Sequence, residues 1–280
     1  MIYILISAFF FGSYGIWSRL MVGEFGEFSQ AWTRGLFLLI VILILNWRFR
    51  FIKAIEQKDW KWFIPIALAG GINQAPYFLG FEHLGIGTAT LLFYAALTIG
   101  GYLLGVVFFN EKISRIKYLS LSLAVIGMFM IYRFNLTLAQ IFPATMTIFA
   151  GLLGATTVIL PKKLLGQYDE LQIMLGYFLA QIIFNLPLSL LLHNSLPPLS
   201  LSRAWFGQLG YAISMLIANY SAIEGFRRLE PSVGSLIGLA EIIFGLLFGI
   251  IFFKETLSAS IVLGSIFIIL AAALPNLRKQ

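Results

Sequence analysis

Ten long apolar runs follow one another along the chain, and each approaches the length that a helix needs to cross a lipid bilayer, about 20 residues. They are 3–21, 28–47, 62–81, 87–109, 117–134, 141–160, 171–192, 206–226, 232–253 and 258–275. The runs are continuous rather than alternating, and in hydrocarbon such a backbone satisfies its hydrogen bonds only as a helix. We therefore expect an all-α membrane protein with ten transmembrane helices.

The composition excludes an ordinary soluble protein, because 60% of the residues are hydrophobic, 11% are charged and the mean hydropathy is +0.91. The connections between runs are short, so any function must reside within the membrane. The chain has no cysteine, which excludes disulfides and thiolate metal sites. We expect no cofactor and no bound metal. Arg19 closes the first run and further spans follow, which predicts a retained helix rather than a cleaved signal peptide.

The net charge of +7 is better explained by membrane topology than by a nucleic-acid surface. Membrane proteins retain positive residues on the cytoplasmic side. With the N-terminus inside, that side holds most Lys and Arg residues: Arg48, Arg50, Lys53, Lys58, Lys61, Lys112, Arg115, Lys117, Lys162, Lys163, Arg227, Arg228, Arg278 and Lys279. We therefore expect a multi-pass protein of the cell (inner) membrane with both termini in the cytoplasm, which binds no nucleic acid.

A shift of the sequence by 144 positions reveals an internal repeat, in which Glu111 falls on Glu255 with glycines matched alongside. Five spans in each half would insert the second copy upside down. We therefore expect two inverted repeats, 1–134 and 141–275. Inverted repeats in transporters hold the substrate near the membrane midplane and rock one half against the other. The alternative is a duplication kept for folding alone.

Five short segments occur in a fixed order across the spans. They are FGSYGIWSR at 11–19, AWTRGLFLL at 31–39, GIGTATL at 85–91, FFNEK at 108–112 and FFKET at 252–256. In this order and spacing the chain resembles the EamA-type transporters of the drug/metabolite transporter (DMT) superfamily. The resemblance implies a ten-helix carrier, often an exporter of amino acids or other metabolites, with a central cavity lined largely by helices 1, 3, 4, 6, 8 and 9.

The chain departs from the family pattern in two places. Many relatives carry proline in the middle of helices four and nine, where this chain has Thr98 and Ile242. Because no proline ring breaks a backbone hydrogen bond there, we expect these two helices to be straighter. Helix seven has Gly176 where the repeat would match Arg34, so that arginine is present in one half only.

Helix nine carries a carboxylic acid, Glu241, near its middle. The same helical face carries Gly234, Gly238, Gly245 and Gly249, a pattern that allows close approach of a neighbouring helix. A charge at the bilayer centre costs about 2.5 to 3.5 kcal/mol, so we expect Glu241 to face protein or a cavity and to be protonated part of the time. Such an acid suits proton exchange or recognition of a substrate amine. The alternative is a neutral glutamate hydrogen-bonded in a packed interface, and the repeat mate, Leu97, has no acid.

Arg34 is expected roughly 9 Å deep in helix two, at ~1.5 Å per residue. Its functional interpretation is a gate ion pair, to which Glu241 is also a candidate, or an anchor for a substrate carboxylate. The structural alternative is that it snorkels to the outer interface and fixes helix two through carbonyls or an outer acid. The outer acids in reach are Glu24, Glu27 and Glu255.

Further polar and aromatic residues at mid-depth complete a candidate substrate cavity with Glu241. They are Ser13, Tyr14, Trp17, Asn73, Gln74, Tyr77, Tyr94, Thr98, Thr156, Thr157, Asn219 and Tyr220. Pro76 gives helix three a place to bend. Any single member is as readily explained by an interhelical hydrogen bond or an interfacial aromatic. Together they predict a moderately polar, aromatic-lined pocket.

These features favour a secondary-active exporter of a small metabolite, an amino acid or similar amphipathic solute, with a proton as one candidate coupling ion. The sequence has no GxxxxGK loop for ATP, and no HExxH or GxSxG motif for an intramembrane enzyme. We therefore expect no catalytic residues. A channel or a lipid-translocating protein is the alternative function. The substrate, the coupling ion and the choice between monomer and homodimer are left open.

Overall fold

The computed structural model describes residues 1–84, 86–132, 136–254 and 258–277. Within these residues the regular structure is helical. The α-helices are α1 (Ile2–Gly12), α2 (Tyr14–Met21), α3 (Glu27–Phe49), α4 (Trp60–Ile72), α5 (Gln74–Leu84), α6 (Ile86–Phe109), α7 (Arg115–Ile131), α8 (Ile141–Ile159), α9 (Glu170–Leu191), α10 (Arg203–Arg228), α11 (Pro231–Gly238), α12 (Ala240–Phe253) and α13 (Ala259–Leu277). Three short 3-10 turns join them, η1 (Gln57–Asp59), η2 (Leu138–Gln140) and η3 (Leu160–Lys163).

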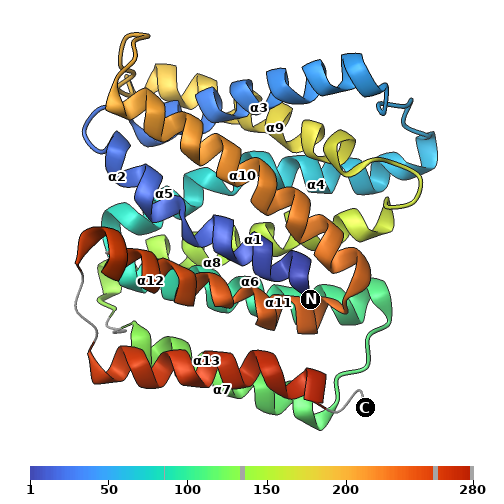
Figure 1. Cartoon of the computed structure of the whole chain (residues 1–280), viewed down its shortest axis with the longest axis vertical. Helices are drawn as coiled ribbons and strands as arrows, with labels where there is room; N and C mark the ends of the chain where they lie inside the picture. Colours follow the sequence, from blue (N-terminus) through green and yellow to red (C-terminus); the bar gives the residue numbers. More distant parts are fainter. Residues whose placement is uncertain (85, 133–135, 255–257, 278–280) are drawn as a thin grey trace.

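These helices make ten spans, because α1 with α2, α4 with α5, and α11 with α12 each form one span in two pieces (Figure 1). Six stretches of the described residues are long and apolar enough to cross a membrane by length and composition: Ile2–Met21, Glu27–Phe49, Thr88–Phe109, Leu138–Lys163, Glu170–Leu191 and Pro231–Phe253. The predicted all-α membrane fold is confirmed.

Two of the broken spans have a local cause in the sequence. Pro76 has no N–H, so the carbonyl of Ile72 loses its helical partner, and the span breaks between α4 and α5 at Asn73. At Ser13 the side-chain hydroxyl donates to the carbonyl of Phe10 at 2.6 Å, and Ile16 N–H bonds back to Ser13 at 3.0 Å in a tightened turn.

Helices four and nine were expected to be straighter for lack of a central proline. Helix four is the unbroken α6, but the expectation is wrong for helix nine. That span breaks at Leu239, without a proline, between α11 and α12. The N–H of Leu239 bonds to Leu236 at 3.2 Å and that of Ile242 bonds to Leu239 at 3.0 Å, both with 3-10 spacing. The break therefore comes from a tightened turn next to Gly238, and it falls just before Glu241.

Corresponding spans of the two halves pack against each other. α3 packs on α9, α6 on α11 and α7 on α13, while α1 packs on α10 as α5 packs on α8. The two copies are thus inverted and interlocked instead of standing side by side. The α7–α13 pair forms an outer layer of the bundle, and both chain ends lie at the same end of it (Figure 1).

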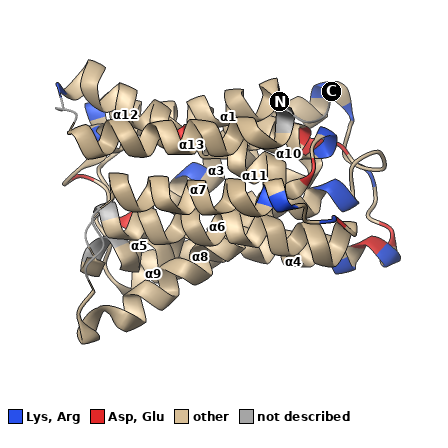
Figure 2. Ribbon diagram, turned by 90° about the horizontal axis from the view of Figure 1, so that it is seen from below, with Lys and Arg blue, Asp and Glu red and all other residues tan. Residues whose placement is uncertain are grey.

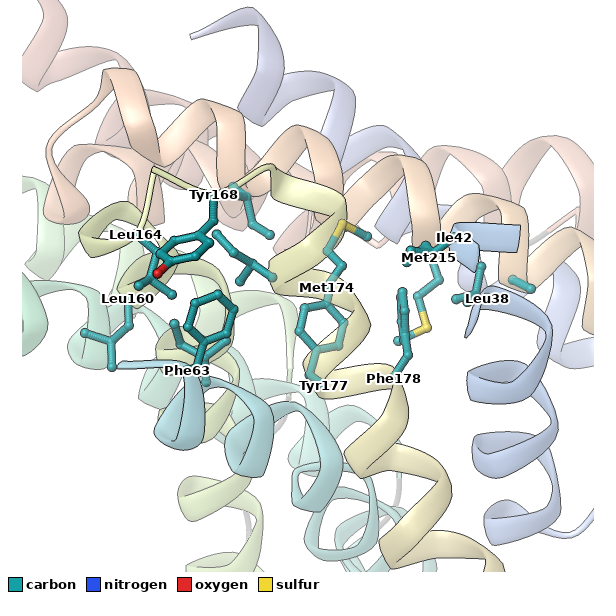
Figure 3. Packing of buried hydrophobic residues seen from close by; sticks show 14 residues of the cluster. Leu38, Ile42, Phe63, Leu160, Leu164, Tyr168, Met174, Tyr177, Phe178 and Met215 are labelled. Carbon is teal, nitrogen blue, oxygen red and sulfur yellow. The ribbon is translucent and has the colours of Figure 1, made fainter. Parts of the chain in front are cut away.

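The largest buried apolar cluster joins the two halves where α3, α4, α9 and α10 meet. Leu38 and Ile42 from α3 lie beside Phe178 and Met215, and Phe63 of α4 packs against η3 and the start of α9 (Figure 3). Lipid tails are as apolar as these side chains, so the hydrophobic effect does not drive helices together within the membrane. Close van der Waals packing in this cluster therefore holds the four helices together.

Charged residues gather at the two ends of the bundle, with Lys and Arg most abundant at the end that carries both termini (Figure 2). The orientation drawn from the sequence depends on this asymmetry and stays a prediction. Arg278 and Lys279, which contribute to that expectation, lie outside the described residues.

Candidate functional site

Glu241 lies in the first turn of α12, immediately after the break at Leu239. Its carboxylate accepts a hydrogen bond from the hydroxyl of Tyr94 on α6. α6 belongs to the first half of the chain and α12 to the second, so the acid sits in the seam between the two copies. It points into the bundle, toward protein.

An aromatic wall continues from this hydrogen bond across α6 and α5. The ring of Phe93 meets Tyr94 edge-on at 5.4 Å between centroids, and Tyr77 stacks on Phe93 at 4.2 Å. The hydroxyl of Tyr77 in turn bonds to Thr90 and lies within electrostatic reach of Glu241. Three predicted cavity residues, Tyr77, Tyr94 and Glu241, are therefore brought together here.

Arg34 lies in the interior, with only 1% of its surface exposed. Its guanidinium carbon stands 3.5 Å from the ring centroid of Tyr211 on α10, and Nη2 donates to Gln30 Oε1 at 3.4 Å. A cation over an aromatic face is stabilised without a counterion, and more strongly when water is excluded.

The expectation that Arg34 snorkels to an outer acid is therefore wrong for the acids that the structure describes. Neither Glu24 nor Glu27 forms an ion pair with it, because both side chains are exposed while the guanidinium is held inside by Tyr211. The third candidate partner, Glu255, lies outside the described residues.

Tyr14 of α2 lies between the two charges. Its ring packs on that of Tyr211 at 4.0 Å, and the hydroxyl is within electrostatic reach of both Arg34 and Glu241. Arg34 and Glu241 make no ion pair with each other among the described contacts. Arg34 and Glu241, which were predicted as a gate ion pair, are thus separate, and the rings of Tyr14 and Tyr211 lie between them.

Ser13 and Trp17 extend this interior toward α10. The indole Nε1 of Trp17 donates to Ser214 at 2.9 Å and to Ser13 at 3.2 Å. Ser13 stands at the break between α1 and α2, so this bond holds the joint of the first span against α10.

Several polar atoms of the interior have no protein partner in the described part of the chain. They are the Tyr14 hydroxyl, Thr98 Oγ1, Asn73 Oδ1 and Arg34 Nε. A buried polar group left unpaired costs about 1 to 3 kcal/mol. Beside the half-buried Gly238 the space is open, since an added Cβ would meet no atom within 4 Å. The interior is therefore suited to a polar solute or to water.

Other predicted cavity residues are satisfied elsewhere. The hydroxyls of Thr156 and Thr157 donate to Leu152 and Leu153, each at 3.0 Å, and Asn219 donates to Met215 at 2.8 Å, all within their own helices. Gln74 is half-buried at the start of α5.

Tyr220 is a correction to the predicted cavity. It is 40% exposed and lies near Glu170 and Glu224, away from Glu241. It occupies a different face of α10 from Tyr211 and Ser214, which are three residues apart and both reach the interior.

The sequence prediction missed Tyr211 and Ser214 of α10. It also missed two buried amides, those of Gln208 on α10 and Gln181 on α9. Gln208 donates to Thr33 Oγ1 at 2.6 Å, and Gln181, fully buried, has no partner for its amide among the described residues. The pair at 211 and 214 was detectable from its helical spacing. Gln181 was not, because helix seven is not a cavity helix in the resemblance.

The described residues contain no group of three or more His, Cys, Asp or Glu side chains that could hold a metal ion. The chemistry of the site is therefore that of one carboxyl group, one guanidinium and the hydroxyl and ring faces of tyrosines.

Comparison with known proteins shows the family and the fold. The model of the EamA-like transporter family matches twice, over residues 1–133 and 141–277. An "Uncharacterized transporter" of Helicobacter pylori (strain J99 / ATCC 700824) is 23% identical over 99% of this chain and 96% of its own length. A solved structure titled "Crystal structure of protein" has the same fold, with a TM-score of 0.81 at 13% identity over 99% of this chain and 96% of that one. The chain belongs to the EamA-like transporter family and is a membrane transporter.

Proposed function

We propose that this transporter is a secondary-active exporter of a small zwitterionic metabolite, an amino acid or a similar amphipathic solute. It would act in the cell (inner) membrane with both termini in the cytoplasm, and it would catalyse no covalent reaction. The export direction comes from the family resemblance, and the orientation from the excess of Lys and Arg at the end that carries both termini.

One observation carries the proposed substrate class. Arg34 and Glu241 are held in the same interior, and neither forms an ion pair with another described residue. A zwitterion brings the complementary charges, an amine for Glu241 and a carboxylate for Arg34, and the rings of Tyr14 and Tyr211 lie between them. Charged groups in a membrane interior usually mark a substrate or ion pathway.

Alternating access is supported by the arrangement of the two copies. Glu241 and Tyr94 meet at a seam between inverted halves, the geometry in which one half rocks against the other. We take 1–134 and 141–275 as the two moving units. The breaks at Ser13, Asn73 and Leu239 border the site and give three spans a joint at mid-depth.

Proton coupling would use the same carboxyl group. Glu241 can exchange a proton as the seam opens to one side and then the other, and Tyr94 is placed to donate to its charged form. A channel or a lipid-translocating protein would not need this separated pair of charges, and saturable counterflow distinguishes the carrier from both.

The test begins with purified protein and a thermal-stability screen of amino acids, nucleosides and cationic drugs, since a ligand stabilises the state that it binds. The amino acid with the largest shift is then followed in proteoliposomes by counterflow at several pH values. We expect Glu241→Gln to lower the rate at least about tenfold, because a hydrogen bond to a charged group is worth about 1.5 to 3 kcal/mol. The pH dependence of the remaining rate should be lost.

Two controls interpret the result. Glu56→Gln makes the same chemical change at an exposed residue and should transport as wild type. Leu97→Ala changes the repeat mate of Glu241 and should affect packing more than pH response. Wild-type rate and pH response in Glu241→Gln would make the carboxyl group structural, and absence of stabilisation by every amino acid would remove the zwitterion from the proposal.

A further inference from the structure

A second buried carboxylate, Glu111, lies two residues beyond α6, and α6 ends at the same end of the bundle as both termini (Figure 1). Its side chain is only 2% exposed. Its N–H bonds back to the carbonyl of Gly105 at 2.9 Å, and its carboxylate lies against the same glycine. Its contacts extend well beyond α6.

The carboxylate of Glu111 reaches across to the other half of the chain and caps α11. Ser232 N–H donates to Oε2 at 3.2 Å, and the hydroxyl of Ser232 donates to Oε1. A carboxylate at a helix N-terminus satisfies free N–H groups and interacts favourably with the helix dipole. This cap comes from a span of the first half, whereas α11 belongs to the second.

Lys117 ties the same carboxylate to a second acid. Its Nζ lies 2.6 Å from Glu111 and 2.9 Å from Glu230, the residue that precedes α11. The ion pair is largely buried on the Glu111 side, where removing one partner leaves an uncompensated charge. Glu111, Lys117, Glu230 and Ser232 therefore form one network, which we name the terminal latch.

The packing beneath the latch is built to admit it. A Cβ added at Gly105 would collide with Oε2 of Glu111, and one added at Gly101 would collide with Ser235 of α11. α6 and α11 can therefore approach closely at this end only because both positions are glycine. A pocket of about 430 Å³, lined in part by Lys112, Lys162 and Glu230, lies beside the latch.

From these contacts we infer that the terminal latch is the closure of the transporter at the end that carries both termini. When it is formed, α6 and α11 are held together and the seam that contains Glu241 is shut at this end. Opening toward that end must break the cap on α11 and hydrate Glu111 and Lys117. The inference rests on the proposed alternating-access function, and it adds the residues that hold one of the two closed ends.

The test measures the width of this end directly by double electron–electron resonance, without any substrate. The chain has no cysteine, so spin labels can be placed at Lys112→Cys and Arg227→Cys with no other change. Both positions are exposed, one after α6 and the other at the end of α10, on opposite halves. In lipid nanodiscs we expect one dominant short distance for the otherwise unaltered chain.

Glu111→Gln should raise the population with the longer distance about tenfold relative to the closed one, since it weakens a charge-assisted bond. Ser232→Ala keeps the backbone donor and should give a smaller increase in the same direction. Glu56→Gln, whose carboxylate pairs with Lys58 at 2.8 Å in an exposed position, is the matched control and should give the wild-type distribution.

Wild-type distances in both Glu111→Gln and Ser232→Ala would overturn the inference, and so would a shift toward shorter distances. If Glu111→Gln fails to fold, Ser232→Ala decides alone. The outcome is independent of the proposed substrate. If the variants lengthen the distance in a chain that transports nothing, the latch is supported and the proposed transport is rejected. If transport is intact and the distances do not change, the proposed transport is supported and the latch is rejected.

Discussion

At the level of single residues, the interior is organised by rings placed against charges. Glu241 takes a hydroxyl from Tyr94, and Arg34 lies on the face of Tyr211. The inward position of Glu241 could be predicted from the sequence, because a carboxyl group in an apolar span cannot face lipid without a large cost and the glycines mark the packed face of the helix. The ring beneath Arg34 could not, because Tyr211 is 177 positions away in the chain and reaches α3 only through the packing of α10.

Arg34→Lys tests whether the planar guanidinium matters. We expect the substrate KM to rise about tenfold with a smaller change in maximal rate, since lysine keeps the charge and loses the stacked, forked geometry. Counterflow at varied substrate concentration in proteoliposomes measures both values.

Arg19→Lys is the matched control for that substitution. Arg19 also lies over an aromatic ring, at 3.7 Å from the centroid of Phe253, but it is exposed near a helix end. Its replacement should leave KM within about twofold of wild type, because exposed cation–ring contacts are weak. An equal rise in KM for both variants would show that Arg34 has no special part in binding.

At the level of helices, the glycines of helix nine have different neighbours although they share a predicted face. α1 and α12 approach closely at Gly12, where an added Cβ would stand 2.8 Å from Phe244 Cβ and 3.0 Å from Gly245 N. Gly238 faces open space instead. Spacing predicted the common face, but which glycine touches a neighbour is decided by the break at Leu239, a short-range distortion that no residue type announces.

Gly12→Ala and Gly238→Ala should therefore differ in their effect on stability. The first should destabilise the fold by about 1 to 3 kcal/mol through overpacking. The second should leave thermal stability unchanged or slightly raised, because alanine is the better helix former. Thermal unfolding in detergent compares the two, and equal loss of stability would show that Gly238 is packed.

At the level of the whole molecule, the spans were largely predictable because hydrocarbon imposes one length and one secondary structure on the chain. Which spans pack together could not be predicted. The contacts of α7 with α13 and of α3 with α9 join apolar surfaces that are far apart in the sequence and resemble those of the other spans. The distribution of Lys and Arg is the remaining feature of the whole molecule, and it predicts the orientation in the membrane. These residues are most abundant at the end with both termini (Figure 2).

The orientation is tested with single cysteines in the cysteine-free chain. Gln57→Cys and Ser200→Cys are both exposed, in connections that the topology puts on opposite sides. In intact cells a membrane-impermeant maleimide should label Ser200→Cys, and Gln57→Cys only after permeabilisation. The opposite pattern would invert the assigned orientation.

The interlocking of the two copies also constrains how the protein is made. The first copy leaves the ribosome before α10 and α12, which carry the partners Tyr211 of Arg34 and Glu241 of Tyr94. Until those spans are inserted, the guanidinium lacks the ring of Tyr211 and the phenol lacks the carboxylate of Glu241, so both groups reach their folded surroundings only when the second copy is in place.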